Sequence, residues 1–146
     1  MSSRDPFDLE RFVAAQDAHQ THARALEELR AGLKRSHWMW FVFPQIAGLG
    51  ASPMAQRYAI RSLDEARAYL AHPVLGARYR ECVAVLSSLS TTDAKAVFGG
   101  IDAKKLRSSL TLFLRAAPND DAFARALEKF FAGALDQRTL DLLGAG

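Results

Sequence analysis

The segment Ser36-His37-Trp38-Met39-Trp40-Phe41-Val42-Phe43-Pro44-Gln45 holds both tryptophans of the 146-residue chain and constrains how the rest must fold. Its seven consecutive apolar residues, 38–44, cannot all face water, because aromatic side chains bury the largest areas. The run is shorter than the ~20 apolar residues that cross a bilayer. We therefore expect it to pass through the core of a soluble protein, as a short helical turn with an extended exit at Phe43-Pro44.

Two interpretations of this run remain open. In the first, it is a core segment whose polar ends, His37 and Gln45, lie near the indole N–H groups. In the second, it is one wall of a ligand pocket, and its polar ends contact the ligand. The glycine-rich loop 48–50 leads into a helix expected to start at Ser52-Pro53, which is compatible with an anion site. However, its glycine spacing matches no phosphate-binding motif.

The flanking sequence is predicted to be helical throughout. Leu26, Leu29 and Leu33, for example, follow His22 at spacings of three and four. Helix starts are expected at or beside Asp5, Thr21, Ser52, Ser62, Asp93, Asp102, Asp120 and Asp136. We find no internal repeat and no long linker, and nothing else in the chain resembles a strand. The expected fold is one all-α domain over residues 1–146, with seven to nine helices, several of them short, around the central aromatic segment.

Composition excludes several classes of protein. The net charge is +3 and its cations are spread along the chain, whereas nucleic-acid binding needs a broad basic face, so we do not expect a nucleic-acid partner. The polar N-terminus resembles no signal peptide, so we expect a cytoplasmic protein without a membrane partner. The lone Cys82 excludes an internal disulfide and a cysteine-rich zinc site, and its place on an apolar helix face predicts a buried, unreactive thiol.

Motifs for familiar chemistry are missing from the sequence. Neither H-E-x-x-H nor G-x-S-x-G is present, and we expect no metal and no cofactor. His19 and His22 are three residues apart, but a break between two helices is expected to separate them. If the protein is a catalyst, His37 is the best candidate for a general acid or base, because histidine titrates near neutral pH.

One predicted helix carries a polar face near the C-terminal third of the chain. Lys104, Ser108, Thr111 and Arg115 are spaced four, three and four, which aligns them on that face. It is either a solvated surface or an edge that contacts phosphate groups.

Three functions therefore remain open. The first is a binding module, for an unknown small molecule or protein, with its site at the polar edge of the aromatic run. The candidate ligand-binding residues are His37, Trp38, Trp40, Gln45 and Ser52, with Gln16, Lys105 and Ser108 as further contributors. The second is an enzyme acting on a phosphorylated or nucleotide-like small molecule, with His37 as acid or base. The third is a protein-interaction module without a small-molecule site, which a large exposed apolar patch would favour.

The aromatic run followed by 48–50 also resembles the signature of a family of bacterial proteins, domain of unknown function 1810. Further similarity to this family lies in Asp5-Pro6-Phe7, Tyr69-Leu70, Lys105-Leu106-Arg107-Ser108 and Thr139-Leu140. The resemblance covers nearly the whole chain and implies a mainly α-helical fold, but no established activity or catalytic residues. Some members carry the label "calpastatin", which the sequence does not support, because that inhibitor is disordered and repetitive.

Overall fold

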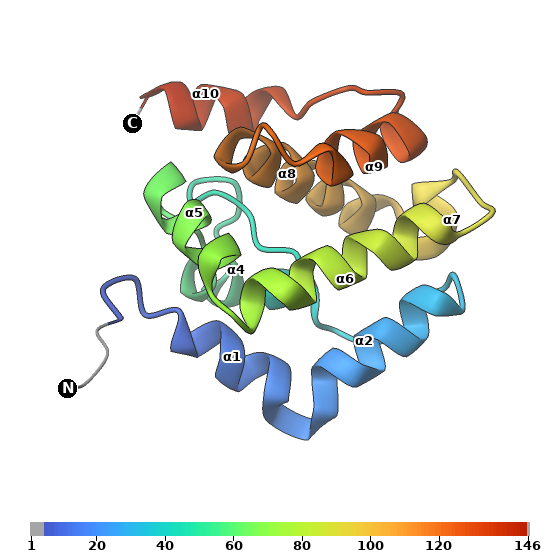
Figure 1. Ribbon diagram of the computed structural model, residues 1–146, viewed down its shortest axis with the longest axis horizontal. Helices are drawn as coiled ribbons and strands as arrows, with labels where there is room; N and C mark the ends of the chain where they lie inside the picture. Colours follow the sequence, from blue (N-terminus) through green and yellow to red (C-terminus); the bar gives the residue numbers. More distant parts are fainter. Residues whose placement is uncertain (1–4, 146) are drawn as a thin grey trace.

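The all-α expectation is confirmed by the computed structural model, which describes residues 5–145 (Figure 1). The helices are α1 (Glu10–Asp17), the 3-10 helix η1 (Ala18–Gln20), α2 (Thr21–Arg30), α3 (Met39–Val42), α4 (Pro53–Arg57), α5 (Leu63–Ala71), α6 (Leu75–Ser88), α7 (Ala94–Phe98), α8 (Gly100–Ala116), α9 (Asp121–Phe131) and α10 (Gln137–Ala145). Strand-like pairing in the described residues is confined to one parallel bridge between Ile46 and Ile60. No helix in this range is long and apolar enough to cross a membrane.

The aromatic run lies inside the helical shell. Figure 1 shows α6 crossing the middle of the view, with α1 and α2 on one side and α8 and α9 on the other. The expected helical turn of the run is α3, and Phe43 follows it in a non-helical conformation, as the proline at 44 requires. Phe43 packs its ring against Tyr79 of α6 and Phe98 of α7, with ring centroids 5.6 and 6.1 Å apart. The run therefore packs against helices that lie far from it in the sequence.

Several predicted helix starts are present as hydrogen-bonded caps. Ser52, Ser62, Asp93 and Asp120 each accept a hydrogen bond from a backbone N–H of the helix that follows. Such caps satisfy donors that the first helical turn would otherwise leave without partners.

Two predicted starts differ from the structure. The first helix begins at Glu10, although Asp5 still accepts hydrogen bonds from the backbone N–H groups of Leu9 and Glu10, at 2.7 and 2.9 Å. The start of α8 is Gly100 rather than a residue after Asp102, because Gly99, with φ +81°, already turns the chain into the helix. Asp102 lies in the first turn, where its carboxylate is free to pair with lysines.

The path of the chain into the aromatic run depends on the carboxylate of Glu28 on α2. This buried group accepts hydrogen bonds from the backbone N–H of Arg35 at 2.7 Å, the backbone N–H of Ser36 at 2.9 Å and the indole N–H of Trp38 at 3.0 Å. The Ser36 hydroxyl donates a further one. Glu28 therefore holds the turn 35–38 against α2 and supplies the partner that the buried Trp38 indole needs.

Hydrogen bonding also controls the ionisation of Glu28. Burial alone would raise its pKa, but the donors from Ser36, Arg35 and Trp38 prevail and lower the pKa to about 2 from an ordinary 4.5. The carboxylate is thus charged, and its charge stabilises the fold at neutral pH.

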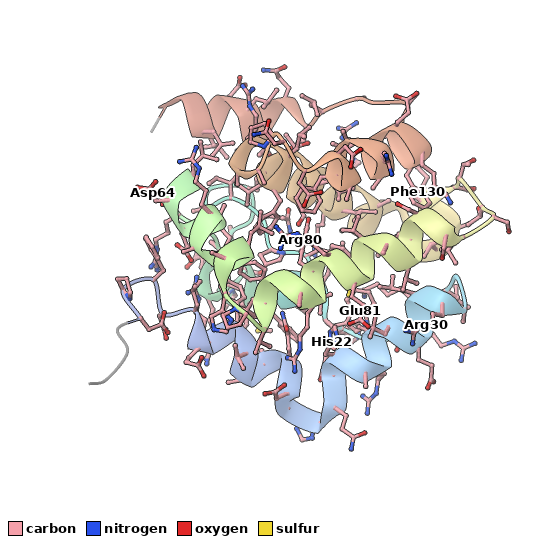
Figure 2. All side chains as sticks on the ribbon, viewed as in Figure 1. His22, Arg30, Asp64, Arg80, Glu81 and Phe130 are labelled. Carbon is pink, nitrogen blue, oxygen red and sulfur yellow. The ribbon has the colours of Figure 1, made fainter. Side chains whose placement is uncertain are left out.

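His22 lies beside Glu81, between α2 and α6 (Figure 2). Its Nε2 atom is 3.2 Å from a carboxylate oxygen of Glu81, and burial is the main cause of a lowered His22 pKa. The break expected between His19 and His22 is present, since His19 and Gln20 both adopt positive φ angles. The two histidines therefore do not share a helical face.

We predict that Glu28→Gln lowers the free energy of unfolding by about 2–3 kcal/mol, because an amide presents a donor to groups that are themselves donors. Glu27→Gln is the matched control, since Glu27 is the exposed neighbour on the same helix. Urea denaturation of both variants measures the difference. Equal stability of Glu28→Gln and the wild type would contradict the role given to this carboxylate.

The lowered pKa of Glu28 predicts that the free energy of unfolding depends on pH. Because folding lowers the Glu28 pKa, its contribution is complete above 4.5 and is lost as the pH falls towards about 2. The free energy of unfolding of the wild type should therefore fall more steeply than that of Glu28→Gln across this acid range. Parallel curves from denaturation at each pH would refute the assignment.

The buried thiol gives an independent check on the packing. Cys82 is 1% exposed, and burial is the main cause of a pKa raised to about 12. At about pH 8 the thiolate population should be roughly a thousandfold lower than in the unfolded chain. Ellman's reagent should therefore react with Cys82 only after denaturant is added, and rapid reaction with the native protein would show that α6 does not pack as described.

Candidate functional site

A cavity of about 600 Å³ lies between the loop that follows the aromatic run and the first turns of α8. We call it the loop cavity; its walls come from segment 45–61, from α8, and from Asp136 and Arg138 at the start of α10. Five of the eight predicted ligand-binding residues line it: Trp40, Gln45, Ser52, Lys105 and Ser108. The fold thus brings the exit of the aromatic run next to a helix that is distant in the sequence.

The loop wall is fixed at its base and at its tip. At the base, the backbone N–H of Ala47 donates to the carbonyl of Ile60, and the N–H of Ile60 donates to the carbonyl of Gln45, at 2.8 and 2.9 Å. At the tip, Gly48 has φ +102°, and a Cβ atom there would lie 3.1 Å from the Leu142 side chain of α10. A glycine at this position therefore lets α10 lie close to the loop.

Positive charge dominates the cavity walls. Four cationic side chains line them, Arg61, Lys104, Lys105 and Arg138, against the single carboxylate of Asp136 among the described lining residues. Lys105 is paired with a residue outside the cavity, and Arg138 donates to the carbonyl of Gly48 at 3.3 Å. Within residues 5–145, Arg61 and Lys104 make no ion pair. The walls therefore have cationic charge available for an anion.

The one carboxylate is already occupied by donors of the protein. Asp136 Oδ2 accepts hydrogen bonds from the Ser108 hydroxyl at 2.9 Å and from the backbone and hydroxyl of Thr139, at 3.2 and 2.5 Å. The backbone N–H of Asp136 donates to the Thr111 hydroxyl at 3.0 Å. These bonds attach the start of α10 to α8.

The polar face of α8 is consequently not an edge that contacts phosphate through its hydroxyls. Thr111 is fully buried, and the Ser108 hydroxyl donates to Asp136, so both act inside the protein. Lys104 is exposed at the cavity, and Arg115 is exposed further along the helix.

Trp38 and Gln16 lie in the core and do not line the loop cavity. Trp38 is fully buried and donates to Glu28 rather than to His37 or Gln45 at the ends of the run. Gln16, 2% exposed, donates to the carbonyl of Phe41 at 2.7 Å and to the Tyr69 hydroxyl at 3.2 Å. Both satisfy buried polar groups, as the core interpretation of the run requires.

His37 lies beside the loop cavity rather than in it. It is exposed and lines a separate hollow of about 380 Å³. No hydrogen bond to another residue in the range 5–145 orients its ring, whereas a general base is normally held in place by a partner. Within the same range, no group of three histidine, cysteine, aspartate or glutamate side chains could hold a metal ion.

Several residues of the site and its support were not anticipated from the sequence. Arg61 and Arg138 are isolated basic residues on different segments, so no local pattern indicates that they meet at one cavity. Asp136 was expected only as a helix cap. Glu28 follows another glutamate on a helix with many charges, and nothing in the sequence distinguishes the buried carboxylate from the exposed one.

Comparisons with known proteins agree with this fold. A family model described as "Protein of unknown function (DUF1810)" matches residues 6–143. Among solved structures, the crystal structure of the conserved hypothetical protein Rv1873 from Mycobacterium tuberculosis is similar, with 50% sequence identity and a TM-score of 0.92. The match covers 96% of this chain and 99% of that one. No curated protein matches. The chain therefore belongs to the DUF1810 family of proteins of unknown function.

Proposed function

We propose that the protein is a cytoplasmic binding module for a small phosphate-bearing anion, held in the loop cavity. The observation that carries this proposal is the charge of the cavity, in which four cationic side chains face one carboxylate that protein donors already occupy. A compact anion with several negative oxygens can accept hydrogen bonds from more than one cation at once. The volume of about 600 Å³ lies within the range of small-molecule sites.

The two alternatives have less support. As a catalytic acid or base, His37 would act from the neighbouring hollow without an orienting partner. Within the loop cavity, the Ser108 hydroxyl is already hydrogen-bonded to the Asp136 carboxylate. As for an interaction module, the large exposed apolar side chains Leu33, Ile101 and Leu135 come from three separate segments. Single exposed apolar residues of this kind are normal on a soluble surface.

We expect isothermal titration calorimetry to detect binding of inorganic pyrophosphate or tripolyphosphate at low salt. The double variant Lys104→Gln/Arg138→Gln should weaken binding by about tenfold or more, because it removes two charge-assisted contacts. Added salt should weaken binding of the wild type through screening.

The control is Arg24→Gln/Arg115→Gln. It also removes two positive charges, but from exposed residues that do not line the loop cavity. This pair should bind pyrophosphate with nearly the affinity of the wild type. Absence of binding heat with both polyanions, or an equal loss in both double variants, would rule out a phosphate site in the loop cavity.

A further inference from the structure

The hollow lined by His37 meets the loop cavity along a shared wall. We call it the His37 hollow; it has a volume of about 380 Å³ and is also lined by Lys34 and Phe98. Three residues line both spaces: Trp40, Ile101 and Lys105. Trp40 therefore lies, with Ile101 and Lys105, in the wall that the two spaces share.

The two tryptophans of the aromatic run differ in what remains open to a ligand. Trp38 is fully buried, whereas Trp40 is only partly buried and keeps some of its surface exposed. The Lys105 ammonium lies 5.0 Å from the centroid of the Trp40 ring and 3.4 Å from a carboxylate oxygen of Asp102. A cation is thus held against the indole at the junction.

This geometry joins two recognition elements. An anionic group that contacts Lys105 lies close to the Trp40 ring, because the ammonium is already within cation–π distance of it. A planar ring attached to that anion by a short linker can then stack on the exposed part of the indole. The same indole also lines the His37 hollow.

We propose, building on the phosphate site of the proposed function, that the ligand is a phosphate ester of an aromatic heterocycle, of the nucleotide class. Its phosphate groups lie in the loop cavity among Lys104, Lys105 and Arg138, and its ring contacts Trp40 on the side of the His37 hollow. His37 contacts the ring or the sugar edge and takes no part in bond breaking. This arrangement gives a role to Trp40, the one aromatic side chain of the run that the core leaves partly open.

The test compares ADP with inorganic pyrophosphate, which shares the diphosphate but has no ring, by calorimetry on the full chain. In the wild type, ADP should bind about tenfold or more tightly than pyrophosphate, since stacking on an aromatic side chain strengthens binding by that order. Trp40→Leu should reduce the ratio of the ADP affinity to the pyrophosphate affinity to near one, whereas Trp40→Phe should retain much of that ratio.

Two further variants keep the test decisive. Phe131→Leu, a partly buried aromatic outside both spaces, should leave both affinities unchanged. His37→Gln, on the exposed side of the hollow, should weaken ADP binding a few-fold without affecting pyrophosphate, and it remains informative if Trp40→Leu does not fold.

The outcomes separate the two proposals. Pyrophosphate that binds as tightly as ADP, or an ADP advantage that survives both Trp40→Leu and His37→Gln, would overturn the nucleotide assignment and leave the anion site intact. Failure of both probes to bind would overturn the proposed function together with this inference.

Discussion

The rest of the structure depends on the buried carboxylate of Glu28. Its four donors are the N–H and hydroxyl of Ser36, the N–H of Arg35 and the Trp38 indole, so one charged group fixes both the turn before the aromatic run and the first ring within it. Breaking such a network leaves buried polar groups without partners, which costs more than the loss of a single hydrogen bond on the surface. The path of the chain into the aromatic run follows from this constraint.

Trp38 is held inside the core, whereas Trp40, two residues later, is only partly buried. Trp38 is the non-helical residue before α3, with φ −138° and ψ 4°, and Trp40 lies within the helical turn itself. Asp102 on α8 links their environments, because its carboxylate pairs with Lys34 at 2.9 Å and with Lys105 at 3.4 Å. Lys34 lies over the ring of Trp38 and Lys105 over that of Trp40, with ammonium-to-centroid distances of 4.9 and 5.0 Å. The same carboxylate thus connects the core to the wall of the loop cavity.

Local patterns in the sequence predicted the parts of this structure that local physics determines. The caps at Ser52, Ser62, Asp93 and Asp120 and the turn before Pro44 depend on near neighbours, and all are present. The run has features of both interpretations, the core segment and the pocket wall. Trp38 is buried in the core, and Trp40 lines the loop cavity and the His37 hollow. The sequence could not indicate which residues from distant segments come together in the fold. Glu28, Arg61 and Arg138 owe their roles to contacts with distant segments, and nothing in the sequence next to them distinguishes them from other charged residues.

The central claim is that Trp40, unlike Trp38, faces a cavity with cationic walls, and ionic quenching of tryptophan fluorescence tests it without any assumed ligand. Iodide, an anion, and caesium, a cation, would be titrated into the wild type and Trp40→Phe at constant ionic strength. We predict that iodide quenches the wild type much more than caesium does, because cations concentrate the anion near the exposed indole, and that Trp40→Phe loses this excess. Equal quenching by the two ions, or an iodide effect that persists in Trp40→Phe, would contradict the account.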